Sequence, residues 1–294
     1  MEYITIKEAL EALNQIAKEN NFDNDGIIKW IVVKSMRLNR DQFDKIINVK
    51  VEQFNIMKNA LTRYIQGETL SQIFGFVEFC GNIFNVTENV FDPRLSTESL
   101  VYSVVNAFGS PQQKLRIIDL CTGSGCVAIT IAKMLNCTVD ALDISPLAIE
   151  IAKQNATNLG ANVNFIEFDL NEDWSKIFKE KYDIIVSNPP YWNTEKILKN
   201  EDKVKNNPLI GFNGGVNGLK YIKIIISNAR KYLKKDGMLF LEIDPDQVET
   251  INTLLKENGF ADMELKQDYR GIDRVVSAKN TGLRENENDD MEKE

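Results

Sequence analysis

Apolar residues in the first 66 positions recur every three or four residues, which is the spacing of one face of an α-helix. Three stripes of this kind follow one another along the chain. They consist of Leu10, Leu13 and Ala17; of Ile27, Ile28, Ile31 and Val32; and of Phe54, Met57, Leu61 and Ile65. The pattern predicts a small helical domain over residues 1–66, with the stripes as its core.

Between residues 67 and 92 the helical spacing gives way to short runs of Phe, Val and Ile. Gly75, Gly81 and Asn82 interrupt these runs, as turn residues do between paired strands. We therefore predict a β-hairpin linker over residues 67–92, with its turn near Cys80.

Residues 93–280 alternate short apolar segments such as "LRIIDL", "TVDALDI" and "GMLFLEI" with amphipathic segments such as "PLAIEIAKQNATNLG". Strand and helix in turn predict an α/β fold, in which a parallel, Rossmann-like sheet is covered by helices on both faces. Ligands of such folds bind at the carboxyl ends of the strands. Residues 281–294 are acidic and lack periodicity, so they predict a disordered tail.

The overall charge gives no sign of a nucleic-acid partner. With 35 basic and 43 acidic residues the net charge is -8, whereas proteins that bind a phosphate backbone usually present a basic surface. No apolar run approaches the ~20 residues of a membrane-spanning helix, and the N-terminal residues resemble neither a signal nor a transit peptide. We expect a cytoplasmic monomer that binds neither nucleic acid nor membrane directly.

The sequence contains no histidine. This excludes the most common general base, the most common zinc ligand and every Ser-His or Cys-His nucleophile pair. The four cysteines form no CxxC pair, which suits a reducing compartment, and we expect no metal site. Any chemistry must use carboxylates, amides, hydroxyls or a cofactor.

A strand, a glycine-bearing turn and a helix are combined in "IIDLCTGSGCVAITIAK". Gly123 and Gly125 let the backbone approach a ligand, and the helix that follows presents free N–H groups. Such a turn alone is a weak signal, because it also serves phosphates and dinucleotides. The loop lacks the lysine of a Walker sequence, and Asp119 at the strand end suits an ammonium group better than a phosphate. A nucleotide that carries an amino acid fits this loop better than a dinucleotide does.

Two further acids end predicted strands. Asp143 is placed to accept hydrogen bonds from two ribose hydroxyls. The alternative is an acid at the start of a helix, before Ser145-Pro146. Asp169 could accept a hydrogen bond from an adenine amino group, although "DLNEDW" is also ordinary loop composition.

The string "SNPPY" follows the apolar run "YDIIV". Pro189 and Pro190 fix φ and supply no N–H, so nearby carbonyl groups are free to face a ligand, and Asn188 adds a side-chain acceptor. Two fixed acceptors can hold both hydrogens of a substrate NH2 group and turn its lone pair toward an electrophilic methyl carbon. Tyr191 can pack its ring against the flat group. A rigid turn after a buried strand would explain one proline but not the whole string.

These motifs together resemble the release-factor glutamine methyltransferases, the PrmC/HemK family of S-adenosylmethionine enzymes. "DLCTGSGC" is similar to the family's cofactor loop and "SNPPY" to its catalytic motif. "LSQIFGFVEFCGNIFNVTENVFDPR", "PLIGFNGGVNGLKYIKIIISNA" and "DYRGIDRVV" resemble its hairpin linker, its glycine-rich segment and its closing motif. The resemblance covers roughly residues 5–280 and implies a class I methyltransferase fold after the helical domain.

The resemblance also implies which residues act. Asn188, Pro189, Pro190 and Tyr191 would hold the glutamine of the Gly-Gly-Gln motif of a peptide-chain release factor for methylation at N5. The residues that would contact S-adenosylmethionine are Asp119, Cys121, Thr122, Gly123, Ser124, Gly125, Asp143, Asp169, Leu170 and Asn188. The positions of the motifs add a further expectation: every motif with chemical content lies after residue 90, so we expect residues 1–66 to recognise the protein substrate and residues 93–280 to carry the reaction.

Two segments depart from the family pattern. "FDPRLSTE" keeps Pro93, Arg94 and Glu98 but lacks the second proline and first acid, and "GGVNG" has Asn217 where the family has an acid. Neither change lies in the predicted methyl-transfer motif, so they put partner docking or loop rigidity in question.

Two other functions are compatible with parts of the sequence. DNA or RNA adenine methyltransferases present an exocyclic NH2 group to a similar motif after base flipping, but they would want a basic target-recognition domain. A non-catalytic module could retain the fold and the cofactor without methyl transfer. The intact Asn188 and glycine loop argue against that alternative.

Overall fold

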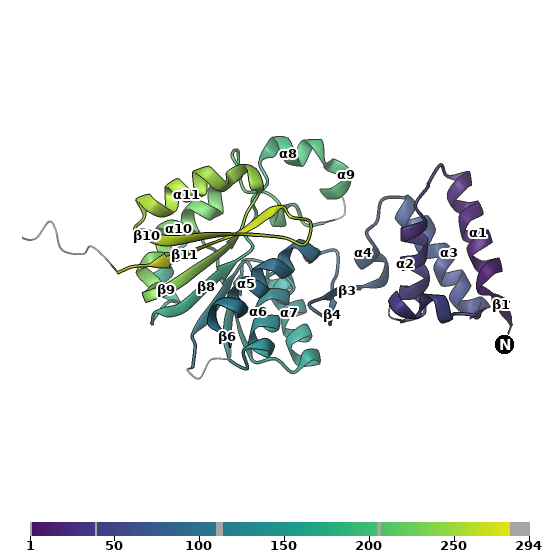
Figure 1. Ribbon diagram of the computed structural model, residues 1–294, viewed down its shortest axis with the longest axis horizontal. Coiled ribbons are helices and arrows are strands. Elements are labelled where there is room, and N and C mark those ends of the chain that lie inside the picture. Colours follow the sequence, from purple (N-terminus) through teal and green to yellow (C-terminus); the bar gives the residue numbers. More distant parts are fainter. Residues whose placement is uncertain (1, 39, 110–113, 205–206, 283–294) are drawn as a thin grey trace, which may run out of the picture. The chain divides into compact units, whose positions relative to one another are not determined.

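The computed structural model describes residues 2–38, 40–109, 114–204 and 207–282 (Figure 1). Most of the predicted acidic tail, residues 283–294, lies outside the described residues. The chain divides into two compact units, Met1–Phe76 and Val77–Glu294.

The first unit consists of helices and one short pair of strands. Leu13, Ile31 and Leu61, each from one of the predicted stripes, are fully buried in its core. The unit continues past residue 66, because the short helix at 70–74 also packs on this core. Its elements are β1 (Tyr3–Thr5), α1 (Ile6–Glu19), α2 (Asp25–Ser35), a 3-10 helix (Arg40–Lys45), β2 (Asn48–Lys50), α3 (Val51–Ile65) and α4 (Leu70–Phe74).

A β-hairpin follows, formed by β3 (Phe76–Phe79) and β4 (Asn82–Asn85). Its two-residue turn lies where the sequence predicts it, with Cys80 and Gly81 both at positive φ, 46° and 71°. A type I′ hairpin turn needs this left-handed backbone at both central positions. Glu98 accepts a hydrogen bond from the Cys80 N–H at 2.7 Å and so ties the turn to a helix of the second unit.

The second unit is built on a seven-stranded sheet in the order β10-β11-β9-β8-β5-β6-β7. Strands β7, β6, β5, β8 and β9 run parallel, as predicted. Strands β11 and β10 complete one edge in antiparallel orientation, which the sequence pattern did not indicate. The strands are β5 (Ile117–Leu120), β6 (Val139–Asp143), β7 (Val163–Glu167), β8 (Tyr182–Ser187), β9 (Leu233–Glu242), β10 (Phe260–Gln267) and β11 (Asp273–Asn280).

Helices cover both faces of this sheet (Figure 1). Side chains alternate along a strand, so that Ile117 packs with α5, α6 and α7 while Ile118 packs with α10 and α11. The predicted Rossmann-like fold is therefore confirmed, apart from the antiparallel edge. The helices are α5 (Glu98–Phe108), α6 (Cys126–Met134), α7 (Pro146–Leu159), α8 (Thr194–Lys199), α9 (Glu201–Val204), α10 (Lys220–Tyr232) and α11 (Val248–Glu257).

Candidate active site

The loop between β5 and α6 is folded tightly against the end of β6. Cys121, Gly123 and Gly125 all have positive φ, at 60°, 55° and 80°. The Thr122 N–H donates to Leu142 O at 2.9 Å, which joins the loop to the neighbouring strand. A side chain at Gly123 would meet no atom within 4 Å, so the loop leaves open space beside its backbone at this position.

Asp119 lies beneath this loop and not on its open side. Its side chain is 1% exposed, and its carboxylate accepts a 2.6 Å hydrogen bond from the Thr122 hydroxyl. Burial raises the pKa of Asp119 to about 7, although the hydrogen bonds of Thr122 and of the Ala128 N–H at the start of α6 lower it. We therefore assign Asp119 to holding the loop and the helix start, and not to direct contact with an ammonium group.

Asp143 is partly exposed at the end of β6. Its two carboxylate oxygens accept the Gly123 N–H at 2.8 Å and the Ser145 N–H at 2.9 Å. The helix cap of α7 is supplied by Ser145, whose hydroxyl accepts the Ala148 N–H. Asp143 thus has lone pairs and an exposed edge left for two hydroxyl donors.

Asp169 and Leu170 follow β7 and differ in orientation. The Asp169 carboxylate accepts both the backbone N–H and the side-chain amide of Asn171, at 2.9 Å and 2.6 Å. Leu170 is 5% exposed and packs in the core beneath the sheet, while its carbonyl accepts the Trp174 indole N–H. Only backbone atoms of Leu170 remain available for a ligand.

The predicted acids converge around Cys121. Burial raises the pKa of the Cys121 thiol well above its usual value, and the charges of Asp143, Asp119 and Asp169 raise it further. Acidic side chains therefore surround this loop, which favours a cationic ligand and disfavours the phosphates of a dinucleotide. S-adenosylmethionine, with one sulfonium and one ammonium group, matches this charge, and the N–H groups at the start of α6 match its carboxylate.

Asn188 follows β8, whose last residue is anchored by a hydrogen bond from the Ser187 hydroxyl to Leu120 O at 2.7 Å. The Asn188 side-chain amide donates to the hydroxyl of Thr97 at 3.2 Å. Within the described residues, no hydrogen bond reaches Asn188 Oδ1 or the carbonyl oxygen of Pro189. These are the two acceptors that the sequence predicts for a substrate NH2 group.

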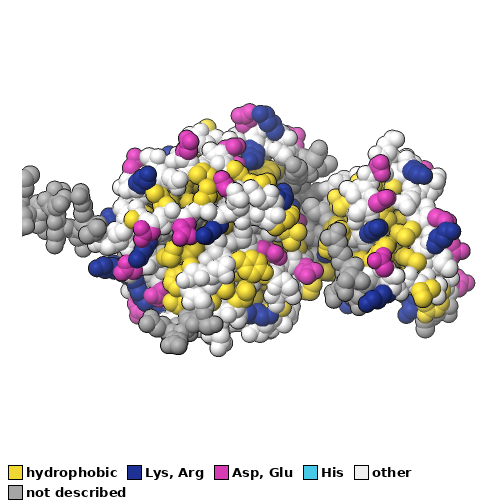
Figure 2. All heavy atoms as spheres, in the orientation of Figure 1, with side chains coloured by type: hydrophobic (Ala, Val, Ile, Leu, Met, Phe, Trp, Pro, Cys, Tyr) yellow, Lys and Arg dark blue, Asp and Glu magenta, His cyan; other side chains and the backbone are white. Residues whose placement is uncertain are grey.

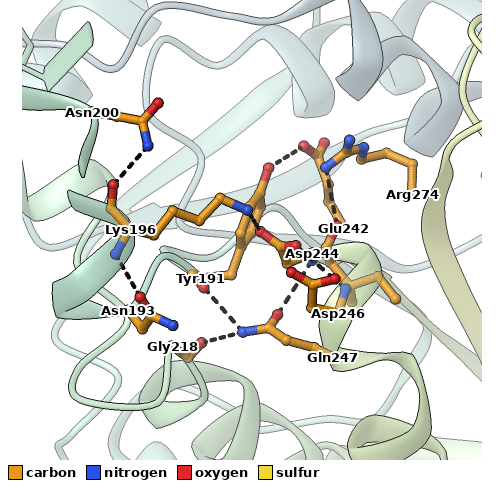
Figure 3. A network of polar contacts seen from close by, with 11 residues as sticks. Tyr191, Asn193, Lys196, Asn200, Gly218, Glu242, Asp244, Asp246, Gln247 and Arg274 are labelled. Carbon is orange, nitrogen blue, oxygen red and sulfur yellow. Dashed lines mark hydrogen bonds and ion pairs between the residues drawn. The ribbon is translucent and has the colours of Figure 1, made fainter. Parts of the chain in front are cut away.

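Tyr191 does not present its hydroxyl to the predicted ligand. The hydroxyl donates to Glu242 Oε1 at 3.0 Å, and Glu242 at the end of β9 is 1% exposed (Figure 3). Burial raises the pKa of Tyr191 well above its usual value. The bond of its hydroxyl thus fixes the Tyr191 side chain, and the aromatic ring, not the hydroxyl, remains to contact a substrate.

Gln247 joins three segments behind this corner. Its amide donates to Tyr191 O at 3.0 Å and to Gly218 O at 3.1 Å, while its carbonyl accepts the Asp244 N–H at 3.2 Å (Figure 3). Asp244 also forms an ion pair with Lys196 of α8. Sequence analysis missed this clamp, because its members lie far apart along the chain.

The "GGVNG" loop packs directly on the corner. A side chain at Gly218 would overlap the carbonyl oxygen of Tyr191 and lie 2.7 Å from the Gln247 amide nitrogen. One at Gly214 would lie 2.7 Å from the carbonyl oxygen of Pro190. Two glycines are therefore required here by space.

A cavity of about 880 Å³ lies between α5 and strands β9, β11 and β10. Its walls include Leu95 and Glu98, which flank Thr97 in the sequence, and the exposed tyrosines Tyr102 and Tyr269. Apolar side chains reach the surface over α5 in Figure 2, among acidic and basic side chains. Among the described residues on the face drawn there, no continuous basic surface is present.

Asn155 of α7 links the hairpin to the glycine loop. The side chain is 1% exposed and its amide nitrogen donates to Asn85 O and to Ser124 O, both at 3.0 Å. Its carbonyl accepts the Asn85 N–H at 2.8 Å. One buried amide therefore fastens β4 to the predicted cofactor loop.

Comparison with known proteins agrees with this geometry. The family model of the methyltransferase small domain matches residues 96–206. The release factor glutamine methyltransferase of Geobacter sulfurreducens is 32% identical over 94% of this chain and 96% of its own length. That of Thermodesulfovibrio yellowstonii is 34% identical over 92% of this chain and 97% of its own. The chain belongs to the release factor glutamine methyltransferase family.

The fold of this family member has a counterpart among solved structures. A methyltransferase from Pyrococcus furiosus matches 76% of this chain and 98% of its own, with a TM-score of 0.53 and 16% identity. The chain is an S-adenosylmethionine-dependent methyltransferase, as its motifs predicted. None of the helices in the described part of the chain has the length and apolar character needed to cross a bilayer. The described residues also contain no cluster of three or more acidic or cysteine side chains arranged to hold a metal ion.

Proposed function

We propose that this chain transfers a methyl group from S-adenosylmethionine to the side-chain nitrogen of the glutamine in the Gly-Gly-Gln motif of a peptide-chain release factor. The observation that carries the proposal is the pair of unoccupied acceptors, Asn188 Oδ1 and the Pro189 carbonyl, at the carboxyl edge of the sheet. Membership in the release factor glutamine methyltransferase family supports the choice of substrate. The reaction takes place in the cytoplasm, where release factors act.

The chain's residues divide into two groups in this proposal. The loop from Cys121 to Gly125, Asp143 and the Asp169-Leu170 backbone hold the cofactor, which supplies an electrophilic methyl carbon when bound. Asp143 accepts hydrogen bonds from the ribose hydroxyls of the cofactor. The acidic surroundings of Cys121 favour the cationic end of the cofactor.

Asn188 and Pro189 orient the substrate amide. Their two oxygens accept both N–H groups, so the nitrogen lone pair is directed at the methyl carbon. Correct alignment of this kind can supply up to about 7–11 kcal/mol of the barrier. Transfer would replace the S–CH3 bond by an N–CH3 bond, with the bonding pair left on a neutral thioether sulfur and one amide proton passing to solvent water, and it would need no histidine.

Methyl-group mapping tests the proposal. The chain is incubated with methyl-labelled S-adenosylmethionine and a bacterial release factor, and the labelled residue is located by mass spectrometry. A release factor with glutamate in place of the Gly-Gly-Gln glutamine is the matched control. Label on the intact motif and none on the control is expected. Label on DNA or RNA adenine, and never on a release factor, would overturn it.

A further inference from the structure

The orientation of the Asn188 amide requires a cause within the protein. A flip of the asparagine side-chain amide by about 180° exchanges the positions of its oxygen and nitrogen at little steric cost. In the proposed function, which this inference extends, only the orientation with Oδ1 toward the substrate is productive. The hydrogen bond from Asn188 Nδ2 to Thr97 Oγ1, at 3.2 Å, selects that orientation.

Thr97 selects this orientation only when its own hydroxyl proton points away from Asn188, because the hydroxyl oxygen must then act as an acceptor for Nδ2. Thr97 is 1% exposed, so water does not compete for the hydroxyl. Its neighbour is Glu242, which is also 1% exposed. Glu242 Oε2 is buried and has no hydrogen-bond partner in the described part of the chain, so this carboxylate oxygen has lone pairs free for a donor. Thr97 is the first of the neighbours that lower the pKa of this carboxyl.

We propose that Thr97 and Glu242 form a positioning relay for methyl transfer. Glu242 accepts the Thr97 hydroxyl proton, Thr97 Oγ1 then presents a lone pair to Asn188 Nδ2, and Asn188 Oδ1 is left as the acceptor for the substrate amide. The same carboxylate accepts the Tyr191 hydroxyl through its other oxygen, at 3.0 Å. One buried acid thereby fixes both ends of the Asn-Pro-Pro-Tyr motif.

The charges around Glu242 are consistent with its acting as an acceptor. Burial raises its pKa to about 7, while Thr97, Tyr191 and Arg274 lower it and Asp268 raises it. Above this pH the carboxylate carries no proton and can only accept. We therefore place the decisive measurements at about pH 8, where the relay is intact.

The test compares three threonine variants. Thr97→Val removes the hydroxyl at nearly constant volume, Thr97→Ser restores it, and Thr130→Val is the matched control. Thr130 is likewise 1% exposed, and its hydroxyl has no partner among the described residues. We expect Thr97→Val to lower kcat roughly tenfold to a hundredfold, with the Kd of S-adenosylmethionine within about twofold of wild type. Thr97→Ser should recover most of kcat, and Thr130→Val should leave it unchanged.

A double-mutant cycle separates a relay from two independent effects. In a relay, adding Glu242→Gln to Thr97→Val should lower kcat little further than Thr97→Val alone, because the orienting contact is already lost. Multiplicative losses would overturn the relay, as would a kcat of Thr97→Val within twofold of wild type. Wild-type chain that methylates no release factor would count against the proposed function instead.

A measurement without turnover keeps the relay testable in that case. The side-chain amide signals of Asn188 are assigned by their loss in Asn188→Asp and followed by NMR. Hydrogen bonding to Thr97 should slow exchange of one amide proton in the wild type and in Thr97→Ser, but not in Thr97→Val. Equal exchange in the wild type and in Thr97→Val would overturn the relay.

Discussion

At the scale of single residues, the site depends on which oxygen and nitrogen atoms remain without partners. Asn188 uses its nitrogen within the protein and keeps its oxygen free, whereas Tyr191 uses its hydroxyl within the protein. Asp143 and Asp119 differ in the same way, because one is partly exposed and the other is enclosed. The chemistry of each side chain therefore follows from its neighbours and not from its type alone.

Asn188→Ala should lower kcat far more than it raises the Kd of S-adenosylmethionine. Removal of the acceptor leaves a substrate N–H unpaired in a dry site, at a cost of about 1–3 kcal/mol, and frees the lone pair to turn away. Single-turnover kinetics and calorimetry measure the two effects separately. Turnover within twofold of the wild type would remove Asn188 from the catalytic role.

Asp143→Ala should weaken S-adenosylmethionine binding about tenfold to a hundredfold. Hydrogen bonds to a charged acceptor contribute roughly 1.5–3 kcal/mol. The substitution also removes the hydrogen bond that Asp143 accepts from the Gly123 N–H, so the glycine loop is held less firmly. Calorimetry gives the affinity, and circular dichroism checks the fold. Unchanged affinity would leave Asp143 with a purely structural part in holding the loop.

The buried carboxyl of Asp119 should make stability depend on pH. Its pKa is about 7 in the folded protein, above the unfolded value, so ionisation is opposed by folding. This group therefore reduces the free energy of unfolding as pH rises from about 4 to 7, by up to about 4 kcal/mol. In urea titrations, the free energy of unfolding should differ less between pH 5 and pH 8 in Asp119→Asn than in the wild type. The exposed Asp173→Asn serves as control, and an equal pH dependence in the wild type and Asp119→Asn would contradict the assignment.

Sequence reasoning predicts site roles for those residues whose motif is local. Asn188 and the glycine loop directly follow a strand and Asp143 ends one, so the sequence pattern alone singles them out. Thr97 stands 91 positions from Asn188, and Glu242 stands 51 from Tyr191. Thr97 lies in a 3-10 turn before α5 and Glu242 ends β9, so their contacts arise only in the folded chain, and no spacing along the sequence encodes them.

At the scale of elements, the corner after β8 is held by the loops around it. The chain from Pro190 to Tyr191 lies against Gly214 and Gly218. Gln247, the residue before α11, donates hydrogen bonds to the carbonyl oxygens of both Tyr191 and Gly218. The sequence pattern did not predict strand β10, because most of its residues after Phe260 are polar and partly or fully exposed. An edge strand of this kind lacks the apolar run by which the central strands were recognised.

Gly218→Ala should lower both stability and kcat. The left-handed backbone costs alanine about 1 kcal/mol, and the new methyl group also displaces the Tyr191 carbonyl. Gly160→Ala is the matched control, because its φ of +63° resembles the +70° of Gly218 but a side chain there meets nothing within 4 Å. We expect both variants to lose stability in urea and only Gly218→Ala to lose kcat. Equal kcat in both would show that the corner tolerates the displacement.

At the scale of the whole molecule, the residues placed in the reaction all belong to the second unit. The first unit has its own buried core and contributes none of them. Sequence periodicity predicted its helices but placed its end at residue 66, because the short helix α4 gives too few turns to reveal a stripe.

Deletion of residues 1–76 should preserve S-adenosylmethionine binding and sharply reduce methylation of an intact release factor. A glutamine side chain alone offers few atoms for binding, so selectivity must come from contacts remote from Asn188. Calorimetry and methylation rates on the same truncated, folded protein measure the two properties. Methylation at the full-length rate would assign the first unit another purpose.

The three hydrogen bonds of Asn155 have a consequence for local unfolding. Because one buried amide bonds both β4 and Ser124, the hairpin cannot detach without leaving polar groups of the glycine loop unpaired. The two segments therefore open as a single cooperative unit and share one protection against exchange with solvent. A ligand that stabilises the loop should therefore also slow hydrogen exchange in strand β4.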